Sequence, residues 1–432
     1  MRRKPAYMRS IDIVSPKRDA KCLSDWDAFF PYYAGYPERF ASTILKSLEI
    51  HPDGVVLDPW NGSGTTPYAA ARLGLSSIGI DINPAMALVA KARLLPPSES
   101  SALVPLGDRI LSSCCWDFSI ADDDPLGVWF GPRTAGYLRS VEIGIRNHLI
   151  GRQLNSEADV GSISCIASAF YVALFSVAKT LASRFSGSNP TWHRSPRSGE
   201  KRISASKVAI EQAFRAQLLR MANALGGLDW EHRDSRIEIR FGDSTCLPLD
   251  DGVVDVVLTS PPYCTRIDYA TTTRFELAVF HGLLPSCYVD LGRRMLGSVR
   301  VPRHAIEATP DWGKTCGSFL RGVELHSSKA SSSYYLKTHL DYYDKLNRSL
   351  AEVCRVTKKG GVAIMVVQDS YYKEMHNDVP GVVAEMASIH GLRLHQRKDF
   401  SARRTMASIN RRSKVYRVRS EAVEAVLCFY KD

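Results

Sequence analysis

The sequence lacks the signals of membrane insertion, secretion and metal binding. None of its apolar runs approaches the ~18 residues of a membrane-spanning helix, and its basic N-terminus, MRRKPAYMRSIDIVSPKRDAK, contains no apolar signal segment. Its ten cysteines are scattered, without a CxxC pair or a His-x3-His partner, so we expect neither a zinc site nor a disulfide framework. We therefore expect a cytoplasmic protein with no bound metal.

Acidic residues are also in deficit. The chain has 56 Lys and Arg against 45 Asp and Glu, a net charge of +11. This excess favours a polyanion such as a nucleic acid as partner, although charge that serves only solubility is an alternative. With 432 residues, the chain can form two or three domains or one elaborated α/β domain.

Four consecutive segments near the N-terminus have the order of a nucleotide-binding unit. An apolar strand ends in Asp58, a glycine-rich turn spans residues 59–66, a helix follows at 67–73, and a second strand ends in Asp81. The glycines allow close backbone approach of a ligand above the helix N-terminus. Asp81 stands where an acid accepts both hydroxyls of a ribose.

The composition of this turn selects among nucleoside cofactors. It lacks the lysine of a phosphate-binding loop and does not match GxGxxG. Asp58 would repel a phosphate, whereas it suits a cationic amino-acid group. Asp243, which ends a third strand, could hold an adenine amino group. The pattern therefore favours S-adenosylmethionine over NAD or ATP.

A rigid loop follows a fourth strand, residues 253–258. Two prolines end the strand and restrict the backbone of Ser260-Pro261-Pro262-Tyr263. Ligands bind at the carboxyl ends of strands in open α/β sheets, and here a hydroxyl, carbonyls and an aromatic ring suit a planar ring with an amino group. A strand-ending turn with a core tyrosine is the alternative.

Two insertions interrupt the α/β pattern. Residues 95–235 contain predicted helices at about 133–150, 162–182 and 203–225. The loop 183–202 is basic with interleaved aromatics; Arg184, Trp192 and Arg194 either contact DNA or form a solvated loop with Trp192 in the core. Residues 265–335 read as irregular, with Arg266 near the pocket wall and a flexible stretch at 326–334.

The remaining segments complete the sheet and add positive charge. We expect a basic tail over residues 1–22, a helix at 335–355 and a buried strand at 362–367 with its loop at 368–371. A helix at 379–389 and strands at 392–398 and 423–430 follow. The basic loop 399–419 is either a solvated face or a phosphate-binding segment, and the second is favoured; its proposed DNA contacts are Arg403, Arg404, Arg411 and Arg412.

The two loops together resemble the exocyclic amino-group DNA methyltransferases. The cofactor motif of that family, DPFxGSGTT, is similar to residues 58–66, with Trp60 in place of phenylalanine, and its catalytic motif is similar to residues 260–263. The form TSPPY resembles the N4-cytosine branch more than the N6-adenine branch. One departure is that the long insertion falls before the third strand. The resemblance implies cofactor contacts from Asp58, Pro59, Trp60, Gly62, Ser63, Gly64, Thr65, Thr66, Asp81 and Asp243. The aromatic segment 29–40 is a looser match to an extra N-terminal cofactor motif of the family, which implies that Phe30, Tyr32 and Tyr33 lie beside the methionine group.

The resemblance implies a Rossmann-like, class I S-adenosylmethionine-dependent methyltransferase sheet with helices on both faces and large helical insertions. Its core would comprise residues 23–94, 236–264 and 336–432, with 95–235 as the candidate target-recognition region. The implied reaction is base flipping and direct methyl transfer to N4 of cytosine in a specific duplex sequence, with Ser260, Pro261, Pro262 and Tyr263 as catalytic residues. A restriction or defence system, with a restriction endonuclease as partner, is the implied context. N6-adenine or RNA methylation, or a silent nucleic-acid-binding protein of this fold, are the alternatives.

Overall fold

The computed structural model describes residues 11–17, 30, 35–186, 193–227, 236–264, 269–285, 290–300, 304–402 and 422–432. Their central feature is a seven-stranded sheet in the order β3-β2-β1-β4-β5-β9-β8. The first five of these strands are parallel, and β9 runs antiparallel to both of its neighbours. The predicted α/β fold, a mostly parallel sheet with helices and a large helical insertion, is confirmed. The strands are β1 (Val55–Asp58), β2 (Ser76–Asp81), β3 (Ile237–Phe241), β4 (Val254–Thr259), β5 (Thr357–Gln368), β8 (Leu392–Ala402) and β9 (Ala422–Lys431), with a separate hairpin of β6 (Ser370–Tyr372) and β7 (Met375–Asn377).

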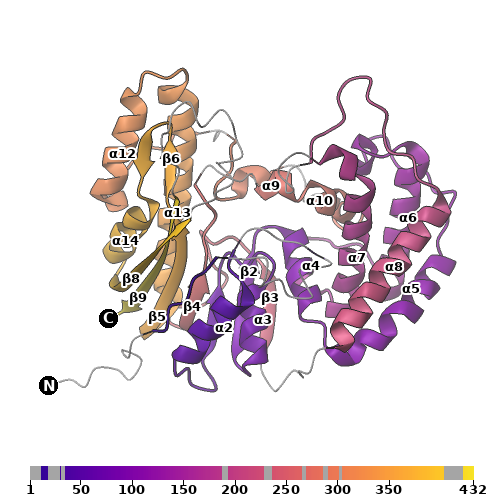
Figure 1. Cartoon of the computed structure of the whole chain (residues 1–432), viewed down its shortest axis with the longest axis horizontal. Coiled ribbons are helices and arrows are strands. Elements are labelled where there is room, and N and C mark those ends of the chain that lie inside the picture. The colour runs from indigo at the N-terminus through magenta and orange to yellow at the C-terminus, as the bar shows by residue number, and fades with distance from the viewer. Residues whose placement is uncertain are drawn as a thin grey trace.

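Helices cover the sheet and also form a separate helical lobe beside it, while α9 and α10 span the region between the two (Figure 1). The helices of the sheet domain are α2 (Glu38–Ser47), α3 (Thr65–Arg72), α4 (Pro84–Arg93), α12 (Gly313–Leu325), α13 (Leu336–Val356) and α14 (Val379–Ile389). The helical lobe consists of α5 (Leu103–Ser112), α6 (Pro132–Leu149), α7 (Cys165–Leu181) and α8 (Lys207–Gly226). The second insertion contributes α9 (Tyr269–Thr272), α10 (Arg274–Phe280) and α11 (Leu291–Arg294).

Side chains of the central strands alternate between two hydrophobic cores, because successive residues of a strand point to opposite faces. Val257 and Val367 belong to the core that α12, α13 and α14 cover. Leu258 and Val366 belong to the core that α2 and α3 cover. The loops at the carboxyl ends of the strands are thus held between two packed layers.

The N-terminal segment 11–17 corrects the predicted tail over residues 1–22. Ile11 and Ile13 are buried in the core shared by α2, α3 and the central strands. Lys398 Nζ donates to the Ile13 carbonyl at 2.6 Å, and Lys17 Nζ donates to the Phe400 carbonyl at 3.2 Å. The prediction rested on charge and overlooked two alternate isoleucines, which are too few to indicate a strand.

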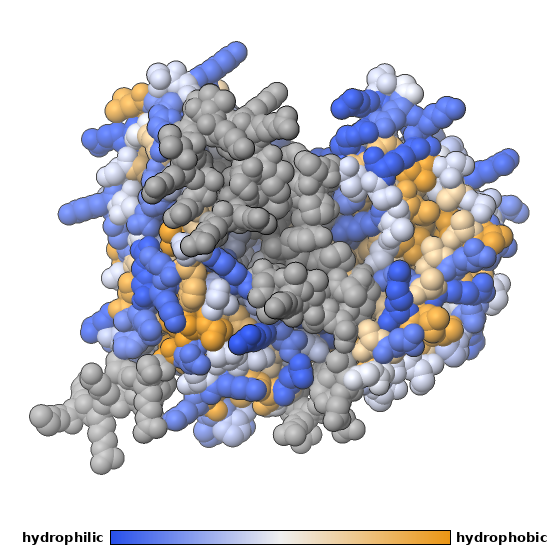
Figure 2. Space-filling model, viewed as in Figure 1, coloured by the Kyte–Doolittle hydropathy of each residue, from blue (hydrophilic) through white to orange (hydrophobic). Residues whose placement is uncertain are grey.

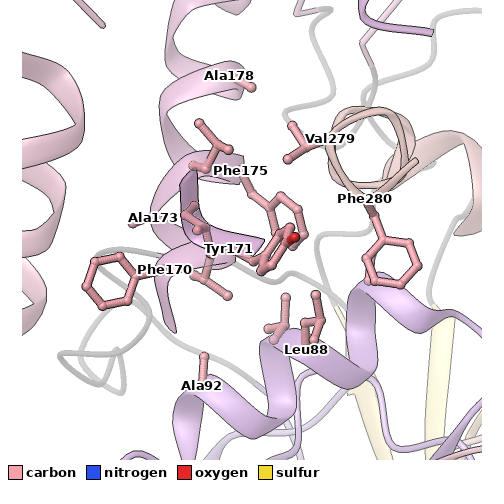
Figure 3. Packing of buried hydrophobic residues seen from close by; sticks show 14 of the residues in the cluster. Leu88, Ala92, Phe170, Tyr171, Ala173, Phe175, Ala178, Val279 and Phe280 are labelled. Atoms are coloured by element: carbon pink, nitrogen blue, oxygen red, sulfur yellow. The ribbon is translucent and has the colours of Figure 1, made fainter. Parts of the chain in front are cut away.

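The helical lobe attaches to the sheet domain through α4, all ten residues of which are buried. Leu88 and Ala92 of α4 face Phe170, Tyr171 and other residues of α7, while Val279 and Phe280 of α10 close the same cluster (Figure 3). The predicted helices at 133–150, 162–182 and 203–225 correspond to α6, α7 and α8. A helix at 103–112, α5, was not predicted.

The second insertion is more ordered than expected. The region 265–335, read as irregular, contains α12, whose buried residues Cys316, Phe319, Leu320 and Val323 have helical spacing. The stretch 326–334, expected to be flexible, includes a helical turn over Ser331–Tyr335. The Ser331 and Tyr372 hydroxyls form a hydrogen bond that holds this turn to the β6–β7 hairpin.

The C-terminal strands are longer than predicted. Residues 399–402, assigned to the basic loop 399–419, continue β8 and pair with β9. In the described parts of the chain no helix is long and apolar enough to cross a membrane. The helical lobe has a mixed surface: α8 exposes Val208 and Leu219, and hydrophobic surface is visible among hydrophilic side chains (Figure 2).

Candidate active site

An open pocket lies at the carboxyl ends of four parallel strands. Its wall includes the loops that directly follow β1, β2, β3 and β4, which is where open α/β sheets bind ligands. The structure therefore brings both predicted loops to one cavity. The predicted residues that line it are Asp58, Pro59, Trp60, Gly62, Ser63, Thr65, Asp81, Asp243, Ser260, Pro261, Pro262 and Tyr263.

Asp58 is a buried carboxylate at the end of β1. Its Oδ1 accepts the Thr259 hydroxyl at 2.5 Å and the Trp60 backbone N–H at 3.2 Å. Burial of the carboxylate nevertheless raises the pKa of Asp58 to about 6, because desolvation penalises its charge. No Lys or Arg of the described ranges pairs with it, so the pocket holds an uncompensated negative charge.

Asp81 ends β2 and organises the glycine-rich turn. One of its carboxylate oxygens accepts the Gly62 N–H at 2.7 Å, and the other accepts the Asn83 N–H at 2.8 Å. Desolvation raises the pKa of Asp81 to about 6 as well. Because each oxygen has a further lone pair, the carboxylate can still accept hydroxyl groups from a ligand in the pocket.

Two residues of the predicted cofactor loop support the site from behind. Gly64 has φ +79°, and a Cβ there would lie 2.8 Å from Ala90 Cβ, so this glycine permits close packing of α3 on α4 and does not line the pocket. The Thr66 hydroxyl donates to the Leu258 carbonyl at 3.1 Å and lies 2.5 Å from the Tyr36 hydroxyl. Tyr36 lines the pocket, and the sequence prediction missed it within the aromatic segment 29–40.

The far wall combines the loop after β3 with the second insertion. Asp243 Oδ1 accepts the backbone N–H and the hydroxyl of Thr245, at 2.9 and 2.8 Å. Arg294, Met295, Leu296 and Lys345 also line this part of the pocket. Sequence reasoning missed their role because they follow no motif and come from distant parts of the chain.

Lys345 and Arg294 hold this wall together. Lys345 Nζ donates to the Arg293 carbonyl at 2.6 Å, which fixes α11 to α13, and also to Asp341 of its own helix at 2.8 Å. Arg294 pairs with both carboxylate oxygens of Glu157, at 3.0 and 2.8 Å. The pocket is thus closed by contacts among the helical lobe, the second insertion and the sheet domain.

The residues present fit S-adenosylmethionine. Two buried carboxylates without a cationic partner in the described part of the chain suit the ammonium group and the ribose hydroxyls of this cofactor. The Trp60 Nε1–H is a second indication, since it is buried in this wall with no hydrogen-bond acceptor among the described residues. Buried polar groups are rarely left unpaired unless a ligand or water completes them.

Three contacts from three different elements hold the loop after β4. The Ser260 hydroxyl donates to the Val366 carbonyl of β5 at 2.9 Å. The Tyr342 hydroxyl of α13 donates to the Pro262 carbonyl at 3.0 Å, and the Tyr263 hydroxyl donates to Glu424 Oε1 of β9 at 2.9 Å. No described residue donates to the Pro261 carbonyl. That carbonyl and the lone pairs of Ser260 Oγ therefore remain available as acceptors.

The predicted DNA contacts are only partly described. Arg184 is exposed, stacks on the Phe185 ring at 4.8 Å and donates to the Lys201 carbonyl. Arg194 is engaged by both carboxylate oxygens of Glu200, at 2.5 and 2.8 Å, which lowers the pKa of Glu200 to about 2. Tyr32, Tyr33, Trp192, Arg266, Arg403, Arg404, Arg411 and Arg412 lie outside the described residues.

Phe30 departs from its predicted place beside the methionine group. It is 2% exposed and packs into the core of the helical lobe, with Lys179 Nζ 4.9 Å from its ring centroid. A fully packed aromatic ring of this kind is a core residue. Tyr36, six residues further on, is the described aromatic of this segment that lines the pocket.

Comparison with known proteins relates the chain to DNA methylases. A family profile described as "DNA methylase" (N6_N4_Mtase) matches residues 10–92, which include Asp58 and Asp81. The match confirms S-adenosylmethionine, predicted from the glycine-rich turn, as the cofactor. The chain is therefore related to the N6/N4 DNA methylases.

Similar curated proteins are type II methyltransferases. M.MjaII of Methanocaldococcus jannaschii is 31% identical over 85 residues, which are 20% of this chain and 15% of the relative. M.BsoBI of Geobacillus stearothermophilus is 38% identical over 53 residues, 12% of this chain and 10% of the relative. The matched segments thus span under a fifth of these two proteins. M.AvaI of Nostoc sp. is 21% identical over 395 residues, 85% of this chain and 79% of the relative.

Two solved structures align over most of the chain with low identity. Geranyl diphosphate methyltransferase in complex with S-adenosylmethionine covers 95% of this chain and 96% of its own, at 9% identity and a TM-score of 0.31. The rRNA methyltransferase aviRa from Streptomyces viridochromogenes covers 92% and 87%, at 13% identity and a TM-score of 0.27.

Proposed function

We propose that this relative of the N6/N4 DNA methylases is an S-adenosylmethionine-dependent DNA methyltransferase that methylates the exocyclic N4 of cytosine in duplex DNA. The observation that carries the proposal is the hydrogen bond from the Ser260 hydroxyl to the Val366 carbonyl, at 2.9 Å, in the wall of the cofactor pocket. This bond occupies the one hydroxyl hydrogen. Ser260 Oγ therefore faces a substrate as an acceptor only.

An exocyclic amino group needs such acceptors, because its lone pair is delocalised into the ring and is a poor nucleophile. Ser260 Oγ and the Pro261 carbonyl accept its two hydrogens and direct the lone pair of the nitrogen towards the cofactor. When bound, the cofactor supplies a methyl group on a positively charged sulfur. The loop works through position and electrostatics, since no residue in it needs to form a covalent bond with the base.

Serine in place of aspartate supports cytosine as the target base. The loop is neutral at its first position, as in the TSPPY form that resembles the N4-cytosine branch. N6-adenine is the alternative product, and the nucleoside assay below separates the two. Asp58 is the nearby carboxylate, but we do not assign it as an acceptor for the amino group of the base. Its Oδ1 already accepts the Thr259 hydroxyl and the Trp60 N–H.

Duplex DNA is the proposed substrate. A target base must leave the helix to reach a pocket at the end of a buried strand, and Tyr263, which lines that pocket, would stack on it. The net charge of +11 favours a polyanion, and Arg184 offers an exposed charge on the helical lobe.

The similarity to type II methyltransferases supports a role as the modification enzyme of a restriction–modification or defence system, acting on DNA in the cytoplasm. In that role the chain would protect the sites that a cognate restriction endonuclease cleaves. The helical lobe, residues 95–235, is the proposed target-recognition region because it flanks the pocket and is joined to its wall by the Arg294–Glu157 pair.

The decisive experiment incubates the chain with methyl-labelled S-adenosylmethionine and phage DNA grown in a host that lacks DNA methylation. Mass spectrometry of the digested nucleosides should detect N4-methylcytosine as the labelled product. N6-methyladenine as the sole product would overturn the choice of base. Label in RNA and not in DNA would overturn the substrate, and no cofactor binding by calorimetry would remove the proposal as a whole.

A further inference from the structure

The Tyr263 ring is anchored at its far end by a residue that no family motif includes. Its hydroxyl donates to Glu424 Oε1 at 2.9 Å, although the two residues are 161 positions apart in the sequence. Glu424 lies near the start of β9, where it pairs with Gln368 at the end of β5, and it is 8% exposed. The anchor therefore belongs to the sheet and not to the catalytic loop.

Burying a carboxylate at such a position costs desolvation free energy, which suggests that its hydrogen bond has a role. Burial raises the pKa of Glu424, because desolvation outweighs the hydrogen bond from Tyr263 and the attraction of Lys17. Lys17 comes from the packed N-terminal segment, where its Nζ also donates to the Phe400 carbonyl at 3.2 Å. Three distant segments therefore meet near the Tyr263 ring: Glu424 of β9 accepts from its hydroxyl, and Lys17 of the N-terminal segment attracts Glu424.

We propose that Glu424 is a positioning residue for methyl transfer, which holds the Tyr263 ring where the target base stacks on it. This inference rests on the proposed function. It extends that function to a residue outside both motifs and assigns the hydroxyl of Tyr263 to Glu424.

The hydrogen bond at the phenol oxygen constrains where the Tyr263 ring lies. Pro261 and Pro262 restrict the backbone, and Tyr342 holds the Pro262 carbonyl at 3.0 Å, but these contacts act on the main chain and not on the tyrosine side chain. The phenol oxygen lies on the axis about which χ2 turns, so the bond to Glu424 fixes the direction of that axis, and the preference of the phenol O–H for the ring plane limits χ2. A site whose groups are displaced by about 1 Å can lose about a hundredfold in rate.

The test compares Glu424→Ala, Glu424→Gln, Tyr263→Phe and the double variant Tyr263→Phe/Glu424→Ala. Single-turnover methyl transfer to unmethylated phage DNA should fall about tenfold in Glu424→Ala and in Tyr263→Phe, the effect of one lost hydrogen bond. The double variant should also fall about tenfold and not a hundredfold, because both changes remove the same contact. Glu424→Gln, which keeps an acceptor oxygen, should transfer within about twofold of wild type.

Two further measurements separate positioning from stability. The dissociation constant for S-adenosylmethionine, measured by calorimetry, should be unchanged in all four variants, and transfer is compared well below each unfolding midpoint. Tyr430→Phe, on the same strand, is the matched control and should match wild type. Multiplicative losses in the double variant, or Glu424→Gln as slow as Glu424→Ala, would overturn the inference. Absence of transfer by wild type would instead contradict the proposed function.

Discussion

The Ser260 hydroxyl donates to the Val366 carbonyl at 2.9 Å, across 106 residues of sequence. The bond connects the end of β4 to its neighbour β5, two strands that pair in parallel through Thr259 and Met365. It turns a residue that can donate or accept into one that only accepts. The chemistry of the loop thus depends on strand pairing as well as on the loop sequence.

Replacement of Ser260 by alanine tests this arrangement. Ser260→Ala removes one acceptor for the amino group and should reduce single-turnover methyl transfer by at least about a hundredfold, the scale seen when one group that stabilises a transition state is lost. Its affinity for S-adenosylmethionine, measured by calorimetry, should stay within about twofold, because the carboxylates proposed to hold the cofactor, Asp58 and Asp81, are elsewhere in the pocket. Ser47→Ala, on α2 and far from the pocket, is the control. Loss of cofactor binding in Ser260→Ala would contradict the separation of the two roles.

Cofactor affinity should depend on pH through Asp58 and Asp81. The pKa of each is raised to about 6, so both are ionised at pH 8 and become neutral as the pH falls through 6. Below that value the dissociation constant for the cofactor should rise by up to about tenfold per pH unit for each carboxylate that binds in its charged form. Calorimetry from pH 8 to pH 5 measures this. Asp58→Asn should bind weakly throughout with a shallower slope, whereas Asp53→Asn, on the exposed surface, should follow wild type. An affinity that is flat over this range would reject the assignment.

The same two carboxylates should make the free energy of unfolding fall as the pH rises, whereas they should make cofactor affinity increase. Their pKa values in the folded protein lie above the ordinary value of 3.8, so the folded state binds more protons than the unfolded state between about pH 4 and 6. The free energy of unfolding of the cofactor-free protein should therefore decrease as the pH rises through this window. Urea denaturation at intervals across it checks the sign, and added cofactor should reduce the loss.

Arg139 should be essential to the helical lobe. Its guanidinium, 5% exposed as a side chain, pairs with Asp124 at 3.0 Å and donates to the Ala278 and Val279 carbonyls at 2.9 and 2.7 Å. Arg139→Met leaves these buried acceptors unpaired and should lower the free energy of unfolding by about 3–5 kcal/mol. Urea denaturation measures the change. Arg133→Met, exposed on the same helix, should unfold as wild type does, and equal stability of the two variants would exclude this role for Arg139.

Arg184 and Arg194 should differ in their contribution to DNA binding. Arg184 forms no ion pair within 4.0 Å with a described carboxylate and is only attracted by Glu200 from further away, whereas Arg194 is held by Glu200 at 2.5 Å. Arg184→Ala should therefore reduce the slope of log affinity against log salt by about 1, the loss of one phosphate contact. The neutral replacement Arg194→Ala/Glu200→Ala should leave slope and affinity unchanged. Fluorescence anisotropy with labelled duplex DNA at several salt concentrations measures both, and equal slopes for Arg184→Ala and wild type would count against an Arg184 contact.

Local order along the chain is enough to predict several elements. The strand, turn, helix and strand around Asp58 and Asp81 were predicted because each is defined by residues next to one another in the chain. The helices α6, α7 and α8 were predicted from their periodicity for the same reason. The loop after β4 was predicted to be rigid because two adjacent prolines restrict it.

Which partners these elements contact depends on folding. Val366, Glu424 and Tyr342 reach the loop after β4 from positions 80 to 161 residues away, and no local pattern indicates such a contact. The burial of Ile11 and Ile13 and the place of Lys345 in the pocket wall likewise follow from packing between distant segments. A sequence motif can state which groups the chemistry needs, but the direction of a hydroxyl hydrogen or a tyrosine ring depends on neighbours that only folding brings close.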